Sequence, residues 1–288
     1  MANETTTTSL NDIVDTLIAS AIFTFKQAGV MPSLVQVQSL IGFNGKSADF
    51  PKWDAWASSD VQAGTEGTEF TTNKQASTSV VSGTVAEKLL RVVVSDLSVN
   101  SSTENVIAGV GAVMGNAMAL KLDDDGVNLF GAFDNSVAGA GVTLALDHFQ
   151  TAIQQLTSAG APGPYNAVLS PKQINGPKGI SGAFDNSAIS GGSVSSIGEQ
   201  FAINGFAGMV AGIIIHRSTE IDEDTATLGD AAGAIFSRQA LGLVHKGFMN
   251  RYIESSAGYR GTILVLQGLW IYKEIVGSYG SYLLSDVA

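Results

Sequence analysis

The chain lacks the residues on which several kinds of chemistry depend. Its 288 residues include no cysteine, which excludes disulfides, thiolate metal sites and cysteine nucleophiles. The three histidines, His148, His216 and His245, have no metal-binding spacing. Glycine-rich phosphate loops and the GxSxG nucleophile elbow are missing as well. We therefore expect no catalytic residue, no cofactor, no metal site and no enzymatic activity.

Charge is also scarce. Charged residues make up 14% of the chain, compared with roughly 25% in soluble domains. Since a monomer needs surface charge to stay soluble, we expect other copies or partners to cover much of the surface. The 15 basic and 26 acidic residues give a net charge of -11, which disfavours tight binding to nucleic-acid phosphates.

The start of the chain predicts neither export nor a membrane span. Residues 2–8 are polar and lack the basic region of a secretory signal. The apolar stretch at 13–25 is interrupted by polar residues and is too short to cross a bilayer. We therefore expect no contact with a membrane.

Hydrophobic residues nevertheless make up 45% of the chain, and their spacing predicts two amphipathic helices near its start. The first covers residues 10–25, and its apolar face packs either on the chain's own core or on a neighbouring copy. The second covers 101–122. The DDDG sequence at 123–126 indicates its solvated end. Its predicted apolar stripe consists of Val106, Val110, Val113, Ala117 and Leu120.

Strand signals lie between these two helices and at the end of the chain. Tyr259–Val287 is rich in β-branched and aromatic residues and has the strongest strand pattern in the chain. Residues 44–95 form a long extended excursion that carries scattered aromatic residues. Residues 129–141 are rich in glycine and alanine and predict a loop, and 142–169 predict a helix, a loop and a strand.

This order of elements resembles the major capsid proteins of tailed bacteriophages, which have the Hong Kong 97 fold. The resemblance rests on four stretches: 71–94, 101–122 with the following DDDG, 142–169 and 252–287. It implies an α+β fold with an N-terminal arm, an extended β loop, a long spine helix, and peripheral and axial domains. The implied units are 1–43 (arm and helix), 44–95 (extended loop with a peripheral strand), 96–141 (spine helix and peripheral domain), 142–247 (axial domain) and 248–288 (C-terminal peripheral strands).

The resemblance also implies a function and partners. It implies a structural protein that self-assembles as pentamers and hexamers into an icosahedral head in the host cytoplasm. The head would enclose double-stranded DNA without sequence-specific binding, with scaffolding, portal and decoration proteins as further partners. The candidate intersubunit contacts are Leu17, Ile18, Phe50, Trp53, Trp56 and Phe70.

Three other functions stay open. An encapsulin-type nanocompartment shell would have the same fold and hold cargo enzymes instead of DNA. A secreted filament or surface-layer protein would explain the abundant Ser, Thr and Gly but would need export. An enzyme would need a pocket with converging ionisable groups from distant parts of the chain.

Overall fold

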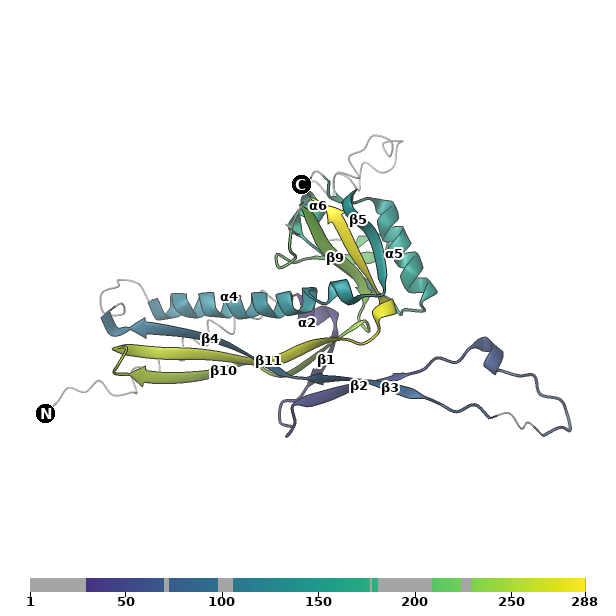
Figure 1. The fold of residues 1–288 in the computed structure, drawn as a ribbon, viewed down its shortest axis with the longest axis horizontal. Coiled ribbons are helices and arrows are strands. Elements are labelled where there is room, and N and C mark those ends of the chain that lie inside the picture. The colour runs from purple at the N-terminus through teal and green to yellow at the C-terminus, as the bar shows by residue number, and fades with distance from the viewer. Residues whose placement is uncertain are drawn as a thin grey trace.

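The computed structural model describes residues 30–69, 73–97, 106–176, 178–180, 209–223 and 229–287. They form an α+β protein with three parts (Figure 1). A long four-stranded sheet carries a helix along its length, a six-stranded sheet stands above one end of it, and a two-stranded arm extends beyond the body. No helix in these described ranges is long and apolar enough to cross a membrane.

The four-stranded sheet is built around one long antiparallel hairpin. Its strand order is β1-β10-β11-β4. The bounds are β1 Gln36–Ser39, β4 Ala86–Ser95, β10 Leu241–Ser256 and β11 Gly261–Glu274. The strand predicted at the start of 259–287 is thereby confirmed. Apolar residues alternate along β11, so one face of the sheet is available to pack against a helix.

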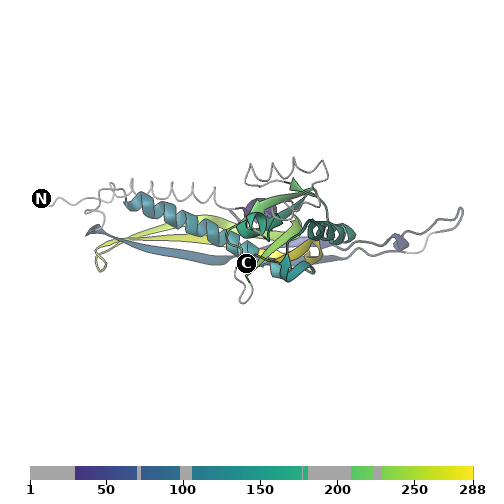
Figure 2. The ribbon, with the colours of Figure 1, turned by 90° about the horizontal axis from the view of Figure 1, so that it is seen from above.

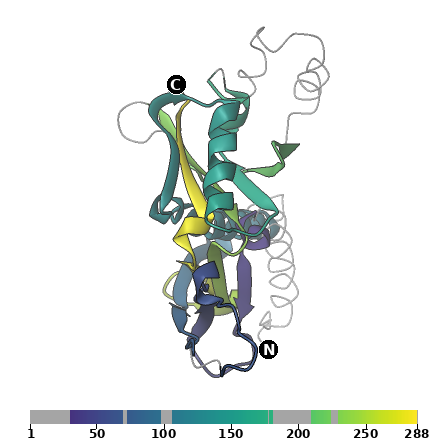
Figure 3. The same ribbon diagram turned by 90° about the vertical axis from the view of Figure 1, so that its right-hand side faces the viewer.

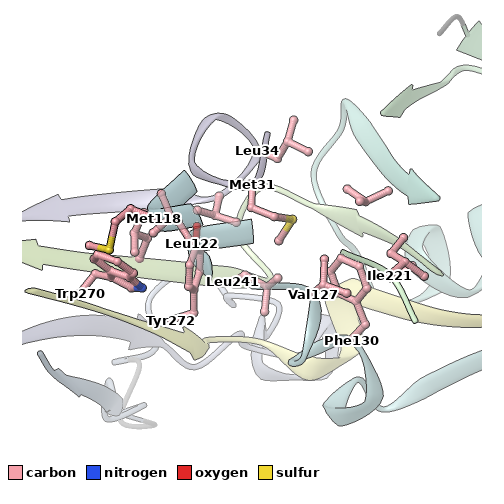
Figure 4. Close-up of a cluster of buried hydrophobic side chains, with 14 of the residues drawn as sticks. Met31, Leu34, Met118, Leu122, Val127, Phe130, Ile221, Leu241, Trp270 and Tyr272 are labelled. Atoms are coloured by element: carbon pink, nitrogen blue, oxygen red, sulfur yellow. The ribbon is translucent and has the colours of Figure 1, made fainter. Parts of the chain in front are cut away.

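That helix is α4, Val106–Val127, which lies along the sheet (Figures 1 and 2). Its buried side chains include Met114, Met118 and Leu122, which belong to the same core cluster as Trp270 and Tyr272 of β11. Figure 4 shows Met118 and Leu122 of this cluster close to Trp270 and Tyr272. The predicted stripe was wrong in part, because Val113 is 70% exposed and Ala117 is also exposed.

The DDDG sequence does not end α4, and the prediction of a solvated helix end there was wrong. Two of its carboxylates find partners that allow the helix to continue to Val127. Asp123 is only 3% exposed and accepts hydrogen bonds from the backbone N–H groups of Val30 and Met31. Asp125 accepts one from Trp270 Nε1 at 2.9 Å. Met31 belongs to the short helix α2, Met31–Leu34, which packs on α4.

The six-stranded sheet has the order β5-β12-β9-β6-β8-β7. Figure 3 shows it above the four-stranded sheet, with α5 beside it. Its strands are β5 Asn135–Thr143, β6 Tyr165–Leu169, β7 Met209–Val210, β8 Ile213–Arg217, β9 Asp230–Ser237 and β12 Gly280–Asp286. Helices α5, Leu146–Ser158, and α6, Pro171–Asn175, accompany it. The loop predicted over 129–141 was wrong, because β5 pairs in parallel with β12 from Asn135 onward.

The C-terminal segment joins both sheets. It forms β11 in the lower sheet, the short turn η4 at Gly277–Tyr279, and then β12 in the upper sheet. The unit expected at 248–288 is therefore divided, since β12 pairs with β5 and β9 instead of with the long hairpin.

The arm is an antiparallel pair of β2, Ser47–Trp53, and β3, Thr78–Thr84. Between them, residues 54–77 carry the short turn η1 at Ser58–Asp60. Figure 1 shows the arm extending past the upper sheet and away from both layers. The extended excursion predicted for 44–95 is confirmed, and its returning part continues directly into β4.

Candidate assembly surfaces

The base of the arm is fixed to the body by close packing. Phe50 of β2 is only 2% exposed, and a Cβ placed on Gly242 of β10 would lie 2.6 Å from Phe50 Cζ. A Cβ on Gly83 of β3 would lie 2.8 Å from Val244 Cγ2. Both glycines thus permit contacts that any larger residue would block. Phe50, a candidate for contact with a neighbour, is already covered by its own chain.

Beyond this base the arm leaves large apolar side chains uncovered. Trp53 is 69% exposed and Trp56 is 55% exposed. Val61 and Val80 on the same arm are 81% and 55% exposed. Two candidate contact residues, Trp53 and Trp56, are thus available to a partner. Large exposed apolar groups that are close together are typical of interaction surfaces.

Polar contacts hold the outer loop of the arm in shape. Asp60 accepts hydrogen bonds from the backbone N–H of Ala57 at 2.9 Å and from Lys74 Nζ at 2.7 Å. The Lys74 ammonium lowers the pKa of Asp60. Ser77 donates its hydroxyl to Asp54 across the two sides of the arm. The outgoing and returning halves are therefore tied together on both sides of Trp56.

A second exposed apolar surface lies on the four-stranded sheet, on the face away from α4. The register places Tyr252, Val265 and Arg91 side by side across three strands. Tyr252 is 57% exposed, and the Arg91 guanidinium lies 5.5 Å from the centre of the Tyr259 ring. Leu89 and Val93 on the edge strand β4 are 61% and 39% exposed. We call this face, Leu89, Arg91, Val93, Tyr252 and Tyr259, the outer sheet face.

The outer sheet face was not among the candidate contacts. The signal for it was present in β4, whose sequence carries apolar residues at successive positions from Val92 to Val94. Such a run places apolar side chains on both faces of a strand, so each face needs a cover. Of the remaining candidates, Leu17, Ile18 and Phe70 lie outside the described residues.

The histidines belong to three different elements and have local surroundings. His148 of α5 accepts a hydrogen bond at Nδ1 from the backbone N–H of Ala145, 3.1 Å away, and so caps the helix. Burial lowers the pKa of both His216 in β8 and His245 in β10. His245 stacks on Phe248 with ring centres 4.2 Å apart. Across the described ranges, no three acidic or histidine side chains are grouped so that they could hold a metal ion.

One cluster of ionisable groups is buried between α4 and the sheet. Burial raises the pKa of Asp123 to about 6, with a smaller contribution from Glu220. Asp125 lies nearby, paired with Lys121 at 3.0 Å and Lys88 at 3.2 Å. Burial also raises the pKa of Tyr272, and the two carboxylates add to that effect. Asp125 connects α4 to Trp270 and Lys88 of the sheet, and Asp123 connects α4 to the backbone at the start of α2. The cluster therefore has a structural role.

Comparison with known proteins gives a match at the level of structure alone. No family model and no curated protein matches the chain. The chain is similar to the capsid structure of the cyanophage P-SCSP1u, with a TM-score of 0.68 and 16% identity over 90% of this chain and 89% of that one. A chain from Mycobacterium phage Che8 has a TM-score of 0.67 and 16% identity, over 88% of this chain and 90% of that one. A virus-like particle from Pyrococcus furiosus has a TM-score of 0.57 and 12% identity, over 93% and 98%. The chain therefore has the Hong Kong 97-like fold found in the capsid proteins of tailed bacteriophages.

Proposed function

We propose that this chain is a structural protein that self-assembles as pentamers and hexamers into a closed icosahedral head around double-stranded DNA. The observation that carries the proposal is the arm, which extends from the body and leaves Trp53 and Trp56 without cover from its own chain. A subunit that must reach and hold a neighbour needs such an element. The fold shared with the phage capsid structures supports the same function.

The exposed residues can supply the energy for association. A buried tryptophan covers roughly 150–250 Å², so covering half of one contributes about 2 kcal/mol or more at roughly 25 cal/mol per Å². The outer sheet face offers further apolar area together with Arg91, and Tyr and Arg are enriched at the centres of protein interfaces. In a closed shell each subunit would bind one neighbour through its arm and would receive the arm of another. The same contribution to the free energy of association would then recur at every subunit contact around a ring.

The remaining parts of the proposal follow from a shell of this kind. The net charge of -11 favours a wall that does not bind the packaged DNA tightly. Assembly would take place in the host cytoplasm, and the product would be the virion head. Scaffolding, portal and decoration proteins are proposed as its partners. We propose a structural role without catalysis, supported by the structural role of the buried carboxylates and by histidines that lie on three separate elements.

A nanocompartment shell is the second candidate. It is favoured by the similarity to the virus-like particle from Pyrococcus furiosus, which extends over 93% of this chain. The two candidates differ in what the shell encloses. Particles from expression with the neighbouring genes would protect long double-stranded DNA from nuclease in the first case and protein cargo in the second.

Electron microscopy of the purified full-length protein tests the proposal. We expect closed particles with icosahedral symmetry, built from rings of five and six subunits. A protein that stays monomeric at all concentrations and salt conditions would overturn it. An open sheet or filament would instead support a surface-layer or filament protein.

A further inference from the structure

Strand β4 lies at one margin of the four-stranded sheet (Figure 1), and within the described ranges it pairs with β11 alone. The pairing continues without a bulge from Ala86 to Ser95, and the strand contains no proline. Its lysine, Lys88, forms an ion pair with Asp125 of α4 at 3.2 Å. Proteins normally block a long edge strand with bulges, prolines or free charges, because such an edge is a template for a further strand. The edge of β4 is therefore open to pairing.

Alternate residues of β4 direct their backbone groups to this open edge. The N–H of Asp96 donates to the carbonyl oxygen of Arg260 at 3.0 Å, one step beyond the register pair of Ser95 and Gly261. In an antiparallel pair the hydrogen-bonded positions recur at every second residue. The even-numbered residues of β4 therefore bond to β11, and the odd-numbered ones direct their N–H and C=O groups outward. The exposed side chains of β4 include those of the same odd-numbered residues, Glu87, Leu89, Arg91 and Val93.

These odd-numbered residues have a charge pattern that is complementary to itself. Glu87 and Arg91 lie two positions before and two positions after Leu89. They are about 13 Å apart along the strand, too far to form an ion pair with each other. Glu87 accepts a hydrogen bond from Gln267, the Arg91 guanidinium lies over the Tyr259 ring, and neither forms an ion pair in the described ranges. An antiparallel copy of the strand, centred on Leu89, would place each Glu87 opposite an Arg91.

We propose that β4 pairs with β4 of a second copy of this chain, in antiparallel orientation, about a two-fold axis at Leu89. Leu89 would face Leu89, and Glu87 would face Arg91 twice. Each of these facing pairs can form two backbone hydrogen bonds, about six in all. Other registers lose the match, because a centre at Arg91 opposes two like charges and a centre at Leu90 places Glu87 opposite Val93.

The pairing would join two four-stranded sheets edge to edge, with both α4 helices on the same face. The contact is isologous, since both copies use the same residues, whereas an arm that reaches a neighbour makes a head-to-tail contact. The inference therefore goes beyond the proposed shell and does not depend on its closure.

The absence of cysteine allows a direct test by cross-linking in the full-length protein. We expect Leu89→Cys, treated with a short thiol-specific cross-linker, to give a covalent dimer from more than half of the chains, because facing Cβ atoms in an antiparallel pair are about 5 Å apart. The matched control is Tyr252→Cys, which is 57% exposed on the same face but two strands away from the edge. Two copies of residue 252 would be at least about 20 Å apart in the proposed dimer, so we expect at least a tenfold lower yield.

Charge reversal on the Leu89→Cys background tests the register. Glu87→Arg and Arg91→Glu would each set like charges opposite one another, and we expect either one alone to lower the yield of covalent dimer at least fivefold. An equal mixture of the two variants matches the charges again, as does the double variant Glu87→Arg/Arg91→Glu. We expect both to recover more than half of the original yield, and circular dichroism checks that each variant folds.

The pairing would be overturned if Leu89→Cys cross-linked no better than Tyr252→Cys, or if the charge reversals had no effect or were not rescued by mixing. Electron microscopy of the same samples separates this inference from the proposed function. Closed particles without Leu89 dimers would overturn the pairing and leave the shell in place. Leu89 dimers without closed particles would support the pairing and count against the shell.

Discussion

Asp123 connects three parts of the molecule through one buried side chain. It lies on α4, accepts hydrogen bonds from the start of α2, and adds to the rise in the pKa of Tyr272 in β11. The N–H donors favour the ionised carboxylate, whereas burial favours the neutral acid. Burial is the larger effect, because the pKa of Asp123 is raised from 3.8 to about 6. At neutral pH this carboxylate is therefore ionised at a cost in stability.

The substitution Asp123→Asn removes that cost while keeping an oxygen for Val30 and Met31. Between pH 4 and 6 the folded chain binds more protons at Asp123 than the unfolded chain does, so its stabilising contribution falls as pH rises. We expect the variant to be about 1–2 kcal/mol more stable than the wild type at pH 7, part of the gain being lost where the amide nitrogen replaces an oxygen. Urea unfolding at several pH values measures this, and the difference should shrink and then change sign in favour of the wild type as the pH falls towards 4, because protonated Asp123 no longer carries the cost of burying a charge.

The neighbouring Asp124→Asn is the matched control for that experiment. Asp124 forms a surface ion pair with Lys121 at 2.6 Å, and such pairs contribute at most about 1 kcal/mol. The Asp124→Asn variant loses this ion pair. We expect its unfolding free energy to change between pH 4 and pH 7 by the same amount as that of the wild type. An Asp123→Asn variant that is less stable than the wild type at pH 7 would show that the N–H donors outweigh burial.

At the scale of elements, patterns that involve large residues were predictable and patterns that involve small or acidic residues were not. The β-branched run in Tyr259–Val287 and the extended excursion at 44–95 predicted strands that the structure contains. The strand β5 escaped prediction because its glycines and alanines show no alternation, and its pairing depends on β12, more than 130 residues away. The end of α4 was misplaced because the partners of Asp123 and Asp125 are distant in sequence.

The same limit applied to the candidate contact residues. Aromatic composition singled out Phe50, Trp53 and Trp56 together, yet only the structure separates Phe50 from the other two. Phe50 is covered because Gly242 leaves room for its ring, and that glycine lies almost 200 positions away. Sequence could therefore predict the extended arm and its aromatic residues without showing which of those side chains the chain itself covers.

The arm gives a prediction that separates folding from assembly. We expect Trp53→Ala and Trp56→Ala to change the unfolding free energy of the subunit by less than about 0.5 kcal/mol, because both side chains are exposed. We expect Phe50→Ala to destabilise the subunit by roughly 3–4 kcal/mol through the cavity it leaves. Denaturant unfolding measures the subunit, and light scattering measures the yield of particles.

The yield of particles is expected to fall at least tenfold in the double variant Trp53→Ala/Trp56→Ala, since the interface loses its exposed anchors. Val80→Ala is a milder control on the same arm. Subunits of either tryptophan variant that fail to fold would place these side chains in the subunit core. Full assembly of the double variant would show that the two tryptophan side chains do not contribute to the contact between subunits.

At the scale of the whole molecule, two neighbouring chain segments join the sheets. One runs from β9 into β10 through residues 238–240, and the other runs from β11 to β12 through 275–279. They are hydrogen-bonded to each other, because the carbonyl oxygen of Ala240 accepts from Ile275 N at 2.8 Å and from Val276 N at 3.2 Å. The two sheets are thus held by a paired connection instead of a single linker, which makes independent folding of either sheet unfavourable.

Removal of β12 should therefore unfold more than the end of the chain. β12 lies between β5 and β9, Ser281 contacts Gln155 of α5 at 2.8 Å, and Lys178 pairs with Asp286 at 2.6 Å. Deleting residues 280–288 removes the strand that pairs with β5 in the described sheet, and it removes Leu283, whose side chain is fully buried in the upper core cluster. Because the connections are paired, we expect the loss to extend to the long hairpin and to abolish soluble folded protein.

Replacing residues 62–69 at the tip of the arm with a short glycine linker is the control, and its circular dichroism spectrum and unfolding should match the wild type. Hydrogen exchange would contradict the prediction if the deletion variant kept wild-type protection in β10 and β11, since the lower sheet would then fold without the upper one.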